Sequence, residues 1–165
     1  MKVILIPEKG VEVNGKPLLL GSSLSDAEAV LGKSEHFSDS NYYFCDADFA
    51  LDFGDDGKLL YIECRSDTEA EIYGINAFET KADKLYDILA AENGDDIDGT
   101  DDGHSYIFNK IRISIWRDTT PEEVLEMIQE AEDDAEPMPE DVKAEEMIAA
   151  EHWDTVGVFV DGYYD

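Results

Sequence analysis

The residues that come nearest to a chemical site are acidic, and the first candidate is a calcium-binding loop. The segment 52–57 places acids at positions one and five and glycine at position six, and Glu63 follows at position twelve, as in an EF-hand loop. Gly54 stands at the third position, where the loop needs an oxygen ligand, and the flanking residues favour strands, whereas the motif requires helices. We therefore interpret this segment as a hairpin turn.

A second acidic segment, residues 95–103, has the flexible carboxylates that suit loose binding of a hard cation. Its acids are Asp95, Asp96, Asp98, Asp101 and Asp102, and they alternate with glycine and other loop-forming residues. The interpretation that the composition favours is a solvated loop. No metal and no cofactor is predicted from it.

The other residues that could carry chemistry do not form a catalytic pattern. His36, His104 and His152 are scattered, and none has a second histidine three or four residues away. The chain has no glycine-rich phosphate loop and no nucleophile elbow. Cys45 and Cys64 are expected to stay reduced in the cytosol. We expect no enzymatic activity; a hydrolase or cation-binding site that forms only in three dimensions is an alternative.

Apolar periodicity and turn residues predict the elements that must position these groups. Strand patterns cover residues 3–6, 11–20, 42–45, 49–53, 58–64, 72–75, 105–108, 111–116 and 156–160. The Asn14-Gly15 pair splits the second of these runs and predicts a tight hairpin. Helices are expected at 25–32, 80–92, 120–136 and 140–151, with caps at Ser25, Thr80 and Thr120 and with Pro121 at a first helical position.

These elements predict a single acidic α+β domain over residues 1–165. The expected architecture is a mainly antiparallel sheet, built as a β-meander, with helices packed on one face. One internal echo is present: a helix followed by strands at 42–44 and 49–53 is similar to a helix followed by strands at 106–108 and 111–115. Two helix-strand-strand repeats are therefore an alternative description of the same sheet.

The overall charge limits the partners of the protein. The chain has 41 Asp and Glu against 12 Lys and Arg, a formal net charge of −29. Binding to nucleic acid or to an anionic membrane relies on lysine and arginine, so neither is expected, whereas a basic protein is the natural partner. No stretch approaches a signal peptide or a membrane span, and a cytoplasmic location is expected.

The acidic residues are concentrated in the last part of the chain. Residues 121–165 contain 16 acidic residues and one basic residue, Lys143. Like charges four residues apart, as in Glu122 with Glu126, cost a helix about 0.2–0.5 kcal/mol each, so we interpret this acid as a functional surface. The predicted partner-binding residues are Glu122, Glu126, Glu130 and Asp133 on this helix, Asp95, Asp96, Asp98, Asp101 and Asp102 in the acidic loop, and Trp153 as an aromatic anchor.

Three segments, 20–32, 49–53 and 58–63, resemble small cytosolic immunity proteins of bacterial polymorphic and contact-dependent toxin systems. They read LGSSLSDAEAVLG, FALDF and KLLYIE, and the resemblance extends over about a third of the chain. Members of that group are often single acidic α+β domains that bind one toxin domain and block it. The resemblance implies a non-enzymatic inhibitor of a basic toxin domain, such as a nuclease, and carries over no functional residue. An acidic adaptor or regulatory domain with another partner is the alternative.

Overall fold

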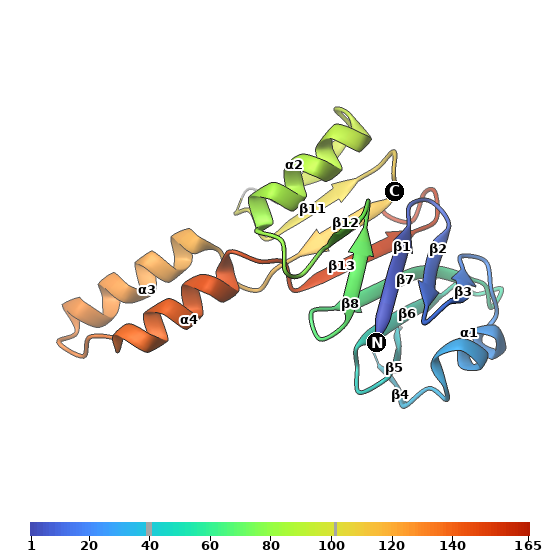
Figure 1. The fold of residues 1–165 in the computed structure, drawn as a ribbon, viewed down its shortest axis with the longest axis horizontal. Helices are drawn as coiled ribbons and strands as arrows, with labels where there is room; N and C mark the ends of the chain where they lie inside the picture. The colour runs from blue at the N-terminus through green and yellow to red at the C-terminus, as the bar shows by residue number, and fades with distance from the viewer. Residues whose placement is uncertain (39–40, 101) are drawn as a thin grey trace.

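The larger layer of the protein is an eight-stranded sheet in which every pair of neighbouring strands is antiparallel (Figure 1). The computed structural model describes residues 1–38, 41–100 and 102–165. In spatial order the strands are β10 (Ile97–Gly99), β11 (Ser105–Phe108), β12 (Ile113–Trp116), β13 (Thr155–Phe159), β7 (Leu59–Arg65), β6 (Phe49–Phe53), β5 (Asn41–Phe44) and β4 (His36–Ser38). The predicted meander 42–64 is confirmed as β5 to β7.

A second, five-stranded sheet was not predicted. Its order is β3 (Lys16–Leu19), β2 (Gly10–Val13), β1 (Lys2–Ile6), β8 (Glu69–Ile72) and β9 (Ile75–Asn76). Strand β1 pairs antiparallel with β2 and parallel with β8. A parallel pair needs a long connection, and here that connection contains β2, β3, the helix α1 (Leu24–Leu31) and the strands β4 to β7, so no local sequence pattern predicts the pairing.

Two tight hairpins of this smaller sheet have the same backbone conformation. Asn14 and Gly15 have φ angles of 48° and 82°, and Tyr73 and Gly74 have φ angles of 49° and 79°. Positive φ at both central residues is what a two-residue hairpin turn requires, and Asn-Gly supplies it at little cost. The hairpin at Asn14-Gly15 is thus confirmed. The turn at Tyr73-Gly74 divides into β8 and β9 a segment that we expected to form one strand.

The two halves of the chain repeat one topology. The first half runs from hairpin β2–β3 through α1 (Leu24–Leu31) to the meander β4–β7, and the second runs from hairpin β8–β9 through α2 (Ala82–Asn93) to the strands β10–β13. The last strands of the halves, β7 and β13, are neighbours at the centre of the larger sheet. In the smaller sheet, β1 lies between the two hairpins. The repeat suspected from sequence is therefore longer than a helix-strand-strand unit.

Helices α1 and α2 pack with the smaller sheet on one face of the larger sheet, which confirms the α+β class. Leu85 and Leu89 of α2 have no exposed surface, and the Tyr86 ring lies 5.6 Å from the ring of Phe108. Burying one such leucine stabilises the fold by about 1.5–3 kcal/mol. Within the described residues, no helix is both long enough and apolar enough to cross a membrane.

The starts of these two helices differ from the prediction. The side chain of Ser23, not that of Ser25, caps α1, because Ser23 Oγ accepts from the Asp26 N–H while the Asp26 carboxylate accepts from the Ser23 N–H. Both serines have an acid three residues later, so the motif alone does not choose between them. Thr80 does not cap α2, since its hydroxyl donates to the Asn76 carbonyl instead.

Candidate partner-binding surface

The most acidic part of the molecule is a helical hairpin that projects away from both sheets (Figure 1). It consists of α3 (Pro121–Asp133) and α4 (Glu140–Ala150), and it forms the connection between β12 and β13. In the first half, the matching connection between β6 and β7 is the turn 54–58. The four-stranded unit can therefore close with a short turn, and the helical hairpin is an addition to the shared topology.

The beginning of α3 follows the prediction. Thr120 Oγ1 accepts a hydrogen bond of 3.3 Å from the Glu123 N–H, and the Glu123 carboxylate accepts one of 2.9 Å from the Thr120 N–H. This reciprocal capping box satisfies two free donors, and Pro121 supplies a first helical residue without one. The chain leaves the helix after Asp133, and Ala135 takes a left-handed φ of 59°.

The hairpin buries little of its own surface. Its buried residues are Val124 and Ala150, which lie in the first turn of α3 and the last turn of α4, next to the body. Leu125, Met127 and Ile148 are 59%, 41% and 59% exposed. These side chains add nothing to the core of the protein and are free to contact another molecule.

The hairpin is almost uniformly negative. Residues 121–150 contain twelve Asp and Glu and a single Lys143. The Lys143 Nζ lies 3.0 Å from Glu140 and 3.8 Å from Glu132, so it bridges α4 and α3, and these carboxylates raise the pKa of Lys143. The only base of the hairpin is thus committed to an internal contact, and the other ten carboxylates have no hairpin base as a partner.

The four predicted residues on α3 are all exposed. Glu122, Glu126 and Glu130 follow one another at intervals of four residues and so lie along one face of the helix. Asp133 continues this face and accepts a hydrogen bond of 3.0 Å from the Gln129 amide. The structure therefore gathers these four carboxylates on one side of the hairpin.

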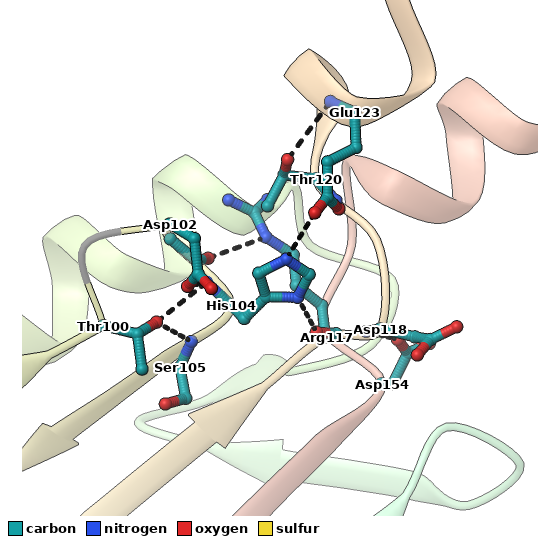
Figure 2. A network of polar contacts seen from close by, with 10 residues as sticks. Thr100, Asp102, His104, Ser105, Arg117, Asp118, Thr120, Glu123 and Asp154 are labelled. Carbon is teal, nitrogen blue, oxygen red and sulfur yellow. Dashed lines mark hydrogen bonds and ion pairs between the residues drawn. The ribbon is translucent and has the colours of Figure 1, made fainter. Parts of the chain in front are cut away.

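A histidine joins the hairpin to the larger sheet (Figure 2). His104 Nδ1 lies 3.0 Å from the Arg117 carbonyl, and His104 Nε2 lies 2.8 Å from Glu123 Oε1. A carbonyl and a carboxylate both accept, so the ring can donate from both nitrogens only when it is protonated. The hydrogen bond to Glu123, followed by that to Arg117, raises the pKa of His104. The capping bond from Thr120, followed by the bond from His104, lowers the pKa of Glu123.

Arg117 holds the other side of the same joint. Its side chain is 8% exposed; Nε donates to the Gly103 carbonyl at 3.1 Å and Nη1 donates to the Ala150 carbonyl at 3.0 Å. The guanidinium also lies 4.6 Å from the ring centre of Trp153. A buried planar cation with this many contacts fixes the end of α4 relative to β12.

Trp153 was the wrong choice as an exposed anchor. It is 2% exposed, its Nε1 donates to the Ala82 carbonyl at 3.0 Å, and its ring meets Tyr106 edge-on at 5.9 Å. Trp116 is the exposed tryptophan, at 43%. The alternation of β12 contained the signal, because Ile113 and Ile115 point to the core and place Trp116 on the opposite face.

The predicted acidic loop is divided between two places. Asp102 lies at the joint, where hydrogen bonds from Thr100 and then from the His104 N–H lower the pKa of its carboxyl. Asp96 and Asp98 lie elsewhere and accept hydrogen bonds of 3.0 and 2.9 Å from the Asn109 amide. Asp95 is exposed beside them in sequence, and Asp101 lies outside the described residues. The loop therefore does not form one surface with α3.

The calcium-like segment is a turn, as predicted. Asp52 ends up on β6, where it accepts a hydrogen bond of 2.8 Å from the Tyr163 hydroxyl, and residues 54–58 turn the chain into β7. Glu63 lies on β7, 3.2 Å from the Tyr61 hydroxyl. In the described parts of the chain, no three His, Cys, Asp or Glu side chains are grouped so that they could hold a metal ion.

Comparisons with known proteins add no family assignment. The chain matches no protein-family model, and neither a curated protein sequence nor a solved structure shows significant similarity to it.

Proposed function

We propose that this protein is a non-enzymatic inhibitor that binds one basic protein through the α3–α4 hairpin, as an immunity protein binds its toxin. The observation that carries the proposal is the hairpin itself: an acidic projection placed where the other half of the fold needs only a turn. A projection that contributes only two buried residues to the fold serves the core little. Its charge and shape favour contact with another molecule.

The charge supports a basic partner. The ten carboxylates of the hairpin that Lys143 does not pair repel one another, and a bound cationic surface relieves that repulsion. A net charge of −29 also accelerates encounter with a positively charged protein. A toxin domain that attacks nucleic acid has a basic cleft for phosphates, and a rigid row of carboxylates can occupy such a cleft in their place.

Apolar contacts support a long-lived complex. Leu125, Met127 and Ile148 are exposed on the same hairpin as the acids. Charge accelerates association, whereas desolvated apolar anchors slow dissociation. The joint formed by His104 and Arg117 holds the hairpin in one orientation, so little entropy is lost when the partner binds.

Capture from a lysate of the source organism tests the proposal. The bait is the wild type, and the beads are washed at about 150 mM and then at about 500 mM salt, where exposed charge pairs are screened. We expect one basic protein to survive both washes, and we expect its toxicity to disappear on co-expression. If several unrelated basic proteins are captured and all of them dissociate at the higher salt, the proposal is wrong.

Two charge-reversal variants assign the interface. E122K/E126K/E130K/D133K should lose the partner, while D55K/D87K/E92K/D161K changes the net charge equally at exposed positions away from α3 and should retain it. Equal loss in both variants would mean that overall charge, not the hairpin, attracts the partner. If a single partner is captured but is not toxic, the acidic adaptor is the correct description.

A further inference from the structure

A groove lies on the body at the base of α4, and a second groove shares part of its wall. The first has a volume of about 660 Å³ and is formed by the β7–β8 turn, the segment after β9 and the end of α4. The second, of about 610 Å³, lies between the β7–β8 turn and Trp116 at the end of β12. Ser66, Asp67 and Asp154 line both grooves, so the two grooves meet at these three residues, and we call the pair the channel.

The exposed apolar surface of the channel comes mainly from Ile148 in the first groove and Trp116 in the second. Phe78 and Trp153, which are 9% and 2% exposed, lie in the wall of the first groove, and the exposed Ile148 stands at its side. The 43% exposed ring of Trp116 lines the second groove. A ring and an aliphatic side chain in these positions offer buried contact area to an extended chain that enters the channel.

The walls of the channel are negative. Asp67, Glu69, Glu79 and Asp154 line the first groove, together with His152, and no lysine or arginine does. Among the described residues, Asp67, Glu69 and Glu79 have no ion-pair partner. In the second groove, Glu63 and Arg65 form an ion pair of 3.8 Å that leaves no net charge there apart from the shared acids.

We propose that this channel holds an extended segment of the partner protein that carries arginine or lysine. This inference rests on the proposed function, because it specifies how the basic partner is recognised. Cationic side chains of the segment pair with Asp67 and Glu79, and one of them lies on the face of Trp116, where the ring attracts a cation. The hairpin steers the partner toward the body, and the channel then selects a segment of matching sequence.

Titration with a defined peptide tests the channel without the natural partner. The probe is the blocked peptide acetyl-GRLRG-amide, added to the isotopically labelled full chain at about 150 mM salt, and amide chemical shifts report where it binds. We expect the shifts to concentrate at residues 63–69, 76–79, 116 and 148–155. Shifts that instead follow α3, or that spread over all acidic surfaces, would overturn the proposal.

Two matched double variants decide whether charge position matters. D67K/E79K should weaken the peptide at least about tenfold, whereas D55K/D87K, with the same change of net charge, should alter its affinity less than about twofold. Trp116→Ala should weaken it in the same direction as D67K/E79K. If either lysine substitution disturbs folding, D67N/E79Q removes the charges without reversing them. Equal weakening by D67K/E79K and D55K/D87K contradicts the channel.

The outcomes separate this inference from the proposed function. If the protein binds the peptide in the channel but captures no basic partner from lysate, the channel inference stands and the inhibitor proposal is wrong. If the protein captures its partner through α3 but the peptide causes no chemical-shift changes in the channel, the inhibitor proposal stands and the channel inference is wrong. Shifts that appear with protein concentration alone would identify a second copy of this chain as the occupant and would also overturn the proposal.

Discussion

The two halves of the molecule share a topology, but the connections that lead to their last strands differ greatly in length. In the first half, the turn 54–58 joins β6 to β7, while in the second half residues 117–154 join β12 to β13 and include a helical hairpin. Both connections deliver a strand to the centre of the larger sheet, where β7 and β13 pair. Since the first half closes with the short connection, the length and acidity of the long one are the features that our proposal assigns to partner binding.

The largest expected effect on partner binding comes from deleting the helical hairpin of the second half. Replacing residues 121–150 by Gly-Ser-Gly-Ser should leave both sheets folded, because only Val124 and Ala150 of this segment are buried, and should abolish capture of the partner. Circular dichroism and a thermal melt check the fold, and the capture assay checks binding. The control inserts the same four residues into the turn 54–58 and should retain the partner. A body that unfolds without the hairpin would show that the hairpin is a structural element.

The next largest effect lies at the centre of the sheet, where β13 carries a glycine opposite a side chain of β7. Gly157 of β13 faces Glu63 of β7, and a Cβ at residue 157 would lie 2.4 Å from the Tyr61 hydroxyl oxygen. Tyr61 cannot move freely, because Tyr163 stacks on it at 5.2 Å and its hydroxyl lies 3.2 Å from that of Ser114. We expect Gly157→Ala to cost about 1–3 kcal/mol in the free energy of unfolding, measured by urea titration.

The double variant G157A/Y61L serves as the control for that substitution. It removes the ring that the new methyl group would meet, so the additional cost of the alanine should shrink markedly compared with its cost in the wild type. An unchanged cost would place the strain in the backbone of β13.

A smaller effect tests whether the tight hairpin turns of the two halves are equivalent. Gly15 and Gly74 have φ angles of 82° and 79°, and no atom would lie within 4 Å of an added Cβ at either residue. Each Gly→Ala substitution should therefore cost about 1–2 kcal/mol, through the left-handed backbone alone. Urea titration should give equal values for the two variants. A clearly larger cost at one of them would mean that the hairpins are not equivalent.

The smallest effect concerns the joint that only the second half has. The pKa of His104 is raised above its ordinary 6.5 in the folded protein. Its contribution to stability is therefore complete below about pH 6.5 and is lost as the pH rises through the folded-state pKa. The melting-temperature difference between wild type and His104→Gln should be largest near pH 6 and should decline toward pH 8. A difference that grows with pH would contradict the hydrogen-bonded imidazolium.

Sequence predicted the features of this fold that depend on neighbouring residues. The Thr120 capping box, the Asn14-Gly15 hairpin and the meander strands are each encoded within a few positions, and all three form as expected. Where the local code was ambiguous, as with Ser23 and Ser25, the prediction chose the wrong residue. The parallel pairing of β1 with β8 joins residues far apart in the chain, and periodicity contains no information about it.

The candidate site shows the same division. The acids of α3 were visible in the sequence because their charge is a property of composition. The channel was not, because its walls come from the β7–β8 turn, the segment after β9 and the end of α4, which only the tertiary fold brings together. The roles of the two tryptophans were also decided by packing: Trp153 lies beneath Arg117 in the core, while Trp116 faces outward.

Hydrogen–deuterium exchange of the protein, alone and bound to its captured partner, tests the central claim most directly. If the added hairpin of the second half is the recognition element, amide protection on binding should appear at α3, at α4 and along residues 63–69 beside the channel, while α1 and the β2–β3 hairpin should exchange as in the free protein. Protection confined to α1 or to the β2–β3 hairpin, with α3 and α4 unchanged, would contradict the account.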